Sequence, residues 1–242
     1  MSNYAFFTGK FVPIEEAKVS IMTHAFNYGT GCFEGIRAYW SEQDQQLYVF
    51  RLREHYERMH RSARILRIHL PQTVEELGEI TLELLRREGY HEDAYIRPLA
   101  YKVDELIGVR LHDLTDGFAM FAVPFGRYLE KEEGAHVCLS SWRRVDDNAI
   151  PARAKITGAY INSALSKTDA LLSGYDEALV LTQDGHISEG SAENFFLLRD
   201  GTLITPPVTS NILEGITRDT IITLAREEMG LCTIERPIDR SE

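Results

Sequence analysis

The sequence is short of cysteine, of basic residues relative to acidic ones, and of long apolar runs. Its 242 residues hold three cysteines, which lie far apart at Cys32, Cys138 and Cys232. This small, odd number argues against a disulfide framework and indicates a reducing compartment. The formal net charge of −11 argues against a nucleic-acid partner, because phosphate binding needs a basic surface.

Signals for membranes and metals are also missing. No apolar run approaches the roughly 18 residues of a membrane-spanning helix. Residues 1–10 have neither the charged leader nor the apolar core of a signal peptide. The eight histidines form no ligand-like pair, and neither C-x-x-C nor H-E-x-x-H occurs. We therefore expect a cytoplasmic protein without a metal and without a nucleic-acid or membrane partner.

The rest of the composition is that of an ordinary globular protein, with 44% hydrophobic and 26% charged residues. The length allows one large domain or two small ones, with a sizeable core. A polar, turn-rich stretch at 124–134 follows a predicted strand and is interpreted as an interdomain loop. It separates a small N-terminal domain, 1–123, from a larger C-terminal domain, 135–242.

The N-terminal domain is predicted to mix helices and strands. Apolar residues at intervals of three and four predict a helix over residues 52–66. A second helix is expected between Thr73 as its N-cap and Gly89 just past its end. The predicted strands of this domain are residues 4–7, 11–14, 32–39, 47–50, 94–103 and 117–123.

The C-terminal domain is predicted to contain helices over residues 160–172 and 215–230. In the first of these, helical spacing predicts an apolar face made of Ile161, Ala164, Leu165, Thr168, Leu171 and Leu172. The predicted strands are residues 136–141, 178–181, 186–188, 195–198, 203–205 and 231–235. Because helices and strands are mixed without a regular βαβ repeat, the predicted fold class is α+β and not a doubly wound sheet.

Lys155 is the first residue that suggests chemistry. It is flanked by small and apolar residues, Ala152, Ala154 and Ile156. Burial favours the neutral amine of a lysine, and a neutral amine attacks aldehydes. The alternative interpretation is a solvated lysine just before a helix.

Two segments of the C-terminal domain contain groups that suit a phosphate or a cationic ring nitrogen. In residues 213–219, Gly215, Ile216 and Thr217 begin a predicted helix, where backbone N–H groups can bind phosphate. In residues 187–196, Glu189 and Glu193 flank a glycine turn, and a carboxylate there would need a cationic partner. An ordinary helix start and a solvated turn are the alternatives.

The N-terminal domain contributes two arginines to the candidates. Arg58 lies next to the apolar stripe of its predicted helix and could bind phosphate, or it could be solvated. Tyr95 and Arg97 are two residues apart on a predicted strand, so they project from one face and could bind a carboxylate. A lysine, a phosphate site and a carboxylate together are the groups that pyridoxal phosphate requires.

Six motifs resemble those of the branched-chain amino acid aminotransferases of fold type IV, which are pyridoxal-phosphate enzymes. They follow the family's order nearly from end to end: S-I-M-T-H-A-F-N-Y-G-T-G-C-F-E-G-I-R-A-Y, E-H-Y-E-R-M-H-R-S-A, A-Y-I-R-P, A-K-I-T-G-A-Y-I-N-S, I-S-E-G-S-A-E-N-F-F and L-E-G-I-T-R-D. The resemblance implies a small α/β N-terminal domain, a larger C-terminal domain with a pseudo-barrel, and an active site between them.

The resemblance also implies roles for individual residues. Lys155 is placed like the catalytic lysine that binds the cofactor, and Arg58, Ile216 and Thr217 like the family's phosphate-binding residues. Tyr160 is placed like the tyrosine that hydrogen-bonds the cofactor's ring oxygen, and Glu193, in preference to Glu189, like the partner of its ring nitrogen. The residues that match substrate-binding positions are Tyr28, Phe33, Gly35, Tyr95, Arg97, Val109, Arg110 and Tyr128.

The function implied by the resemblance is amino transfer between leucine, isoleucine or valine and 2-oxoglutarate. Family members are homodimers or larger, and a loop from the neighbour, here around Val109 and Arg110, closes the site. The family continues beyond Glu242 with a further sheet-plus-helix unit that carries a phosphate-binding threonine-alanine turn. The alternatives are a D-amino acid aminotransferase, an aminodeoxychorismate lyase, or a catalytically impaired truncated relative.

Overall fold

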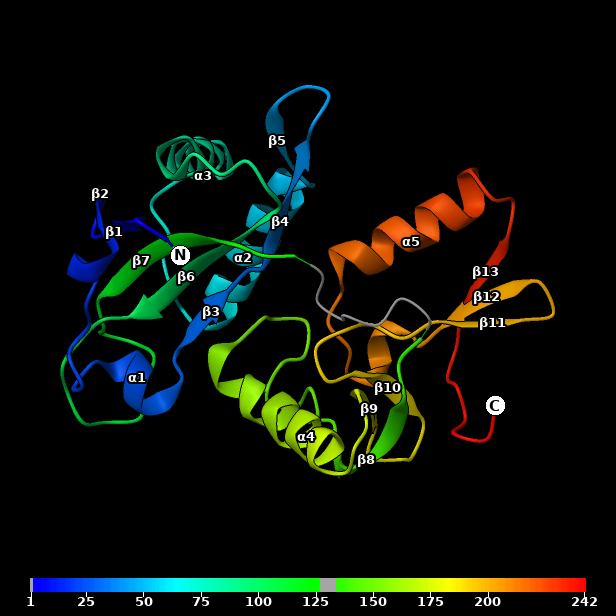
Figure 1. The fold of residues 1–242 in the computed structure, drawn as a ribbon. Coiled ribbons are helices and arrows are strands. Elements are labelled where there is room, and N and C mark those ends of the chain that lie inside the picture. The colour runs from blue at the N-terminus through cyan, green and yellow to red at the C-terminus, as the bar shows by residue number, and fades with distance from the viewer. Residues whose placement is uncertain (1, 127–133) are drawn as a thin grey trace. The chain divides into compact units, whose positions relative to one another are not determined.

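The computed structural model describes residues 2–126 and 134–242, and these fall into two units (Figure 1). The first unit contains the described residues up to 126 together with Ala154–Gly158. The second contains residues 134–153 and Ala159–Glu242. The segment around Lys155, predicted to belong to the C-terminal domain, therefore packs with the first unit. Part of the predicted loop 124–134 lies outside the described residues.

The first unit is built on an antiparallel sheet of seven strands in the order β2-β1-β7-β6-β4-β5, with β3 also paired to β6. Its strands are β1 Tyr4–Phe7, β2 Lys10–Pro13, β3 Gly31–Phe33, β4 Ile36–Ser41, β5 Gln46–Val49, β6 Ala94–Lys102 and β7 Asp116–Pro124. Its helices are α1 His24–Tyr28, α2 Leu52–Ile65 and α3 Val74–Glu88, with a 3-10 turn η1 at Ile14–Glu16.

The core of this unit lies between the sheet and the helices α2 and α3. Along β6, buried residues alternate with half-buried ones, so one face of the strand is covered. Among the side chains of α2 and α3, those of Met59, Leu77 and Leu84 are completely buried. Burial of each of these side chains stabilises the fold by roughly 1.5–3 kcal/mol. The half-buried face of β6 carries Tyr95 and Arg97.

Local signals fix α3 as the sequence predicts. Thr73 Oγ1 accepts a hydrogen bond from Glu76 N (3.2 Å), and Glu76 Oε2 accepts one from Thr73 N (2.7 Å), which completes a capping box. Gly89 ends the helix with φ of 63°, and its N–H donates to the carbonyl of Leu85. A glycine adopts this left-handed conformation without steric cost.

Two features of the first unit differ from the prediction. The expected strand 32–39 is interrupted at Glu34 and Gly35, because Glu34 turns its side chain into the core, where it is fully buried. The short helix α1 was not predicted, because it is only five residues long and leaves Phe26 exposed.

The second unit contains two three-stranded sheets, with orders β10-β9-β8 and β11-β12-β13. Its elements are β8 Val137–Arg143, η2 Thr157–Ala159 at the junction of the units, α4 Tyr160–Leu172, β9 Glu177–Leu181, β10 Ile187–Gly190, β11 Leu197–Arg199, β12 Thr202–Thr205, η3 Val208–Ser210, α5 Ile216–Glu227 and β13 Cys232–Glu235.

Each of these sheets contains one parallel pair of strands connected through a helix. The pair β8 and β9 is joined through α4, and β12 and β13 are joined through α5. These two βαβ units were not predicted from the sequence. Because they lie in separate small sheets with antiparallel partners, the fold class remains α+β, as predicted.

The predicted apolar face of α4 is wrong. Ile161, Leu171 and Leu172 are 65%, 54% and 83% exposed, and the buried residues of the helix are Ser163, Ser166 and Ala170. The helix packs on β8 and β9 through these small residues, which allow close backbone approach. The spacing of apolar residues therefore predicted the wrong face of α4 to be buried.

Candidate functional site

The segment that carries Lys155 is tied to the first unit on both sides of the lysine. Lys155 N donates to Ser62 Oγ of α2 (3.1 Å), and Phe33 N of β3 donates to the Lys155 carbonyl (3.1 Å). Ile156 forms an isolated antiparallel bridge with Cys32. Lys155 is half-buried, and its Nζ lies 5.2 Å from the centroid of the Phe33 ring.

Two glycines make this attachment possible. Gly158 N donates to the carbonyl of Gly29 (3.2 Å), and Gly29 has φ of +65°. A Cβ on Gly29 would lie 2.6 Å from the Cα of Gly158, which real structures do not tolerate. Gly29 must therefore be glycine for the Lys155 segment to lie where it does, while a Cβ on Gly158 would make only a tight contact, 3.2 Å from the Gly29 carbonyl oxygen.

Arg58 lies on α2, four residues before Ser62, and is buried in a bidentate ion pair with Glu34. Its Nε and Nη2 donate to the two carboxylate oxygens at 2.8 and 2.6 Å. His55 Nδ1 is 2.9 Å from the same carboxylate. Burial alone would raise the pKa of Glu34, but the charge and hydrogen bonds of Arg58, with those of His55, hold it at about 2. Sequence reasoning missed Glu34, since a carboxylate in a predicted strand gives no sign of its partner.

Four of the residues that match substrate positions, Phe33, Gly35, Tyr95 and Arg97, lie close together in the first unit. The Arg97 guanidinium carbon lies 4.4 Å from the centroid of the Phe33 ring, and Arg97 Nη2 donates to Tyr95 Oη (2.7 Å). A Cβ on Gly35 would lie 2.3 Å from Tyr95 Oη, so the glycine leaves room for that phenol. Arg97 Nε is buried and has no hydrogen-bond partner within the described chain.

Tyr28 holds the loop that contains Val109 and Arg110. Its Oη accepts a hydrogen bond from Gly108 N (3.2 Å), and the His24 ring packs 4.7 Å from the Tyr28 ring. His24 Nε2 is 2.8 Å from the Gly108 carbonyl. Val109 is 88% exposed and Arg110 is also exposed, so neither packs around Lys155 within this unit. The predicted residue Tyr128 lies outside the described residues.

In the second unit, Glu189 is buried and bound on both oxygens. Arg144 Nη2 donates to Glu189 Oε1 (2.7 Å), while Asn194 Nδ2 (3.0 Å) and Leu213 N (3.1 Å) donate to Oε2. These donors stabilise the ionised carboxylate. Leu213 lies two residues before Gly215, which begins α5. Glu189 is thus hydrogen-bonded to the backbone of the segment that leads into α5.

Glu193 has a different environment from Glu189. Its Oε2 accepts a hydrogen bond from Ala192 N (3.1 Å), and its Oε1 is buried without a hydrogen-bond partner among the described residues. Burial, followed by the negative charge of Glu177, raises the pKa of Glu193. Glu177 itself pairs with Lys167 Nζ at 2.6 Å. The surroundings of Glu193 therefore make its carboxyl harder to ionise than an ordinary glutamate.

Tyr160 and the pair Ile216 and Thr217 are the first residues of helices. Tyr160 is half-buried and begins α4. Gly215 is the N-cap of α5 and has no side chain to cap it; Ile216 is buried and Thr217 is exposed. A first turn without a side-chain cap is the arrangement that binds anions through backbone N–H groups.

The family model described as "Amino-transferase class IV" matches residues 31–242, which include the second unit and the first unit from β3 onward. The chain belongs to the class IV aminotransferases. This confirms the family, the fold type and the enzyme class that the six sequence motifs predict.

Class IV aminotransferases similar to this chain are known in sequence and in structure. A protein of Aquifex aeolicus called "probable branched-chain-amino-acid aminotransferase" is 53% identical over 240 residues, which are 99% of this chain and 77% of that protein. The crystal structure of the branched-chain aminotransferase of Thermoproteus uzoniensis with norvaline is 45% identical, with a TM-score of 0.95, over 100% of this chain and 80% of that one.

A third relative of this class IV aminotransferase has been solved with its cofactor. It is the branched-chain amino acid aminotransferase of Thermobaculum terrenum in its PLP form, 39% identical with a TM-score of 0.93. The match covers 99% of this chain and 78% of that protein. Within residues 2–126 and 134–242, no helix of the present chain combines the length and the apolar character needed to cross a membrane.

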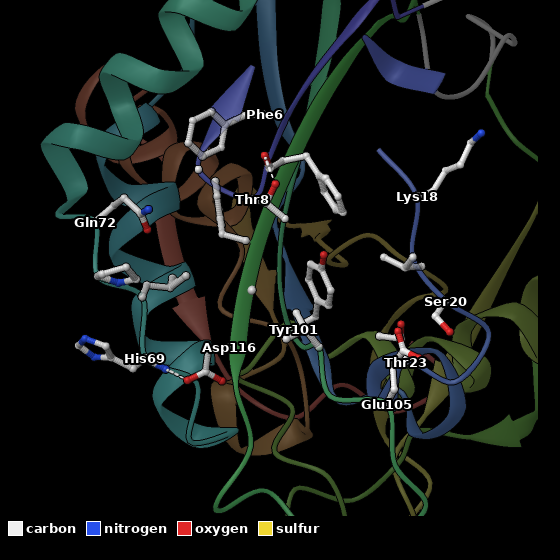
Figure 2. A pocket seen from close by; sticks show the side chains of 18 residues that line it. Phe6, Thr8, Lys18, Ser20, Thr23, His69, Gln72, Tyr101, Glu105 and Asp116 are labelled. Carbon is white, nitrogen blue, oxygen red and sulfur yellow. Dashed lines mark hydrogen bonds between the residues drawn. The ribbon is translucent and has the colours of Figure 1, made fainter. Parts of the chain in front are cut away.

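A separate cavity of about 440 Å³ lies elsewhere in the first unit of this aminotransferase (Figure 2). Phe6, Tyr101 and Asp116 are among the residues that line it, and none of the lining residues was predicted to be a site residue. Asp116 accepts hydrogen bonds from His69 N (2.9 Å) and Lys102 Nζ (2.6 Å), so its carboxylate is already satisfied. This cavity is therefore separate from the Lys155 segment, none of whose residues lines it.

Proposed function

We propose that the protein transfers the amino group between branched-chain L-amino acids and 2-oxoglutarate with pyridoxal phosphate as its cofactor. One observation carries the proposal: the Lys155 amine and the Arg97 guanidinium both lie against the ring of Phe33. An apolar ring beside an arginine can accept a branched side chain and also the distal carboxylate of glutamate. The unpartnered Arg97 Nε, a buried donor, supports an anionic ligand here.

Each unit contains residues that fit the proposed cofactor. In the first unit Lys155 supplies an amine and Arg58 a buried guanidinium; in the second, the start of α5 at Ile216 and Thr217 is the kind of helix start whose backbone N–H groups bind phosphate. Tyr160 would donate to the ring oxygen, as the motif comparison implies. When bound, pyridoxal phosphate supplies an electron sink for the carbon that loses a proton.

The chemical work of the chain itself falls to Lys155. Its amine would take the proton from the substrate Cα and return it at the end of the transfer, as general base and then general acid. Phe33 and Gly35 would shape the apolar part of the substrate pocket, while Tyr95 orients Arg97 through their 2.7 Å hydrogen bond. Tyr128 remains a predicted substrate residue.

For the partner of the cofactor's ring nitrogen we propose Glu189 in place of Glu193, the residue that the motif comparison selected. A protonated ring nitrogen needs an ionised carboxylate, and the ion pair with Arg144 supports that form of Glu189. The raised pKa of Glu193 works against it. Glu189 is also bonded to Leu213 N, close to the phosphate-binding start of α5.

We further propose that the protein is a homodimer or a larger assembly of its own copies. Ile107 and Val109 are 80% and 88% exposed, and Ile21 and Phe26 are 80% and 70% exposed. Apolar side chains exposed to this degree, on α1 and on loops, are typical of a contact surface. Val109 and Arg110 would then act from the loop of the neighbouring copy.

The test compares Lys155→Ala with Lys18→Ala, which changes an exposed lysine of the same unit. Lys155→Ala should abolish amino transfer from leucine to 2-oxoglutarate and remove the visible absorbance that the cofactor gains on binding the lysine amine. Lys18→Ala should change neither. Retention of activity or absorbance in Lys155→Ala would rule out the lysine assignment, and transfer from D-alanine alone would rule out the substrate assignment.

The carboxylates are tested in the same assay. Glu189→Gln keeps the shape of the side chain but removes its charge, so it should lower kcat strongly. Glu193→Gln should have the smaller effect, because Glu193 has no ion pair like that of Glu189 with Arg144 among the described residues, and its pKa is raised. The reverse order would return the ring-nitrogen role to Glu193.

A further inference from the structure

The side-chain amide of Asn194 joins two parts of the second unit that the proposed function assigns to different ends of the cofactor. Its Nδ2 donates to Glu189 Oε2 (3.0 Å) and also to the carbonyl of Leu213 (2.9 Å). Both partners are pure acceptors, so the NH₂ group must face them. One amide thereby holds the carboxylate at the end of β10 and the backbone that leads into α5.

The oxygen of the same amide, Asn194 Oδ1, lies next to Gly215. A Cβ built on Gly215 would lie 2.0 Å from Asn194 Oδ1. Gly215 has φ of −70°, a value open to any residue, so its backbone conformation does not require glycine. The requirement comes from Asn194, which occupies the space where a side chain would be.

Glu189 and the entry to α5 are further linked without Asn194. Leu213 N donates to Glu189 Oε2 (3.1 Å), and Arg144, which holds Oε1, also donates through Nε to the Asn211 carbonyl (3.3 Å). Asn194 adds a further contact, because its Nδ2 donates to the carbonyl oxygen of Leu213. The carboxylate and residues 211–215 are therefore held in one fixed arrangement.

We propose that Asn194 is a positioning residue that couples the ring-nitrogen contact of Glu189 to the phosphate contact of the α5 start. The inference rests on the proposed function. Because one amide fixes both contacts, the site is assembled before the cofactor binds, and the two ends of the cofactor bind cooperatively. Preorganisation of this kind raises affinity by removing the cost of ordering the site.

The test measures dissociation constants for pyridoxal phosphate and for pyridoxal, which lacks the phosphate, by quenching of tryptophan fluorescence. The dissociation constant of pyridoxal divided by that of pyridoxal phosphate reports how much the phosphate contributes to affinity. In Asn194→Ala we expect this ratio to fall about tenfold, in line with the loss of a hydrogen bond to a charged group. Asn148→Ala, which removes an exposed asparagine, should leave the ratio unchanged.

Gly215→Ala tests the same coupling from the other side. The added Cβ should displace the Asn194 amide and lower the ratio as Asn194→Ala does. In the Asn194→Ala background the displaced atom is gone, so Gly215→Ala should then have little further effect. Asn194→Asp, which changes a donor into a carboxylate beside Glu189, should lower the ratio at least as much while conserving shape.

The outcomes separate the inference from the proposed function. Equal loss of affinity for both compounds, with an unchanged ratio, would show that Asn194 only supports the fold and would overturn the inference alone. Additive effects of Asn194→Ala and Gly215→Ala would overturn it too. A wild-type protein that binds neither compound would overturn the proposed function and the inference with it. Circular dichroism on each variant identifies any that fail to fold, and Asn194→Asp then replaces Asn194→Ala.

Discussion

The buried ion pair between Arg58 and Glu34 should make the free energy of unfolding depend on pH. Glu34 is fully buried, and its pKa is lowered from 4.5 to about 2. A difference of this size corresponds to about 3 kcal/mol in favour of the folded state with the carboxylate ionised. This contribution is complete above the unfolded pKa of 4.5 and is lost as the pH falls towards 2.

The perturbation is Glu34→Gln, which keeps the side-chain shape and removes the charge. Arg58 then loses the charge of Glu34, and breaking a buried pair in this way costs about 3–5 kcal/mol at neutral pH. At pH 3 the wild-type protein has lost part of the contribution that ionised Glu34 makes to its free energy of unfolding. The difference in unfolding free energy between wild type and variant should therefore shrink by about 2 kcal/mol between pH 7 and pH 3.

The chain offers a reporter for this measurement. Of its two tryptophans, Trp40 lies in β4 of the first unit, with Glu34, and Trp142 lies in β8 of the second. Urea denaturation in a Trp142→Phe background, followed by fluorescence, therefore reports the first unit alone. Glu79→Gln, at an exposed glutamate of α3, is the matched control and should show no pH-dependent difference.

Two results would refute the reasoning. One is a Glu34→Gln variant whose unfolding free energy differs from wild type by less than about 1 kcal/mol, the scale of a surface pair. The other is a difference that stays constant between pH 7 and pH 3, since then the charge of Glu34 would contribute nothing. Contributions from other titrating groups are common to both proteins and cancel in the comparison.

Two further predictions concern the backbone of the first unit. Gly29→Ala should loosen the Lys155 segment, because its Cβ would meet Gly158, and trypsin should cut faster after the exposed Arg153; Gly9→Ala has the same left-handed strain with open space around it, so cleavage there should not change. Thr73→Ala removes the capping box of α3 and should lower the unfolding free energy seen by Trp40 by about 1 kcal/mol, whereas an unchanged midpoint would show that the cap is dispensable.

Local chemistry was enough to predict some elements of the fold. The helix α3 begins and ends where Thr73 and Gly89 predict, because capping depends on residues within one turn. The strand 94–103 was also predicted nearly to the residue, since alternation is visible in the sequence. The contacts of Phe33 with Arg97 and Lys155 were not predicted, because these residues lie far apart in the sequence.

Other features depend on contacts between distant residues, and the sequence could not show them. Helix α4 buries serines and an alanine because β8 and β9 come close, and nothing in its own spacing indicates this. Glu34 interrupts a predicted strand because Arg58, 24 residues further on, receives its carboxylate. Asn194 and Arg144 were missed for the same reason, since their importance comes from Glu189 and the entry to α5.

The attachment of the Lys155 segment to the first unit has a consequence for synthesis on the ribosome. Ser62 and Lys155 are 93 residues apart in the sequence, so at ordinary translation rates the serine waits roughly 5–20 s for the lysine backbone. The seven-stranded sheet is complete at Pro124 and can form in that interval. Lys155 is then delivered to a sheet that can already have formed, and a nascent chain stalled before Ala154 would carry this sheet without residues 154–158, the last part of the first unit.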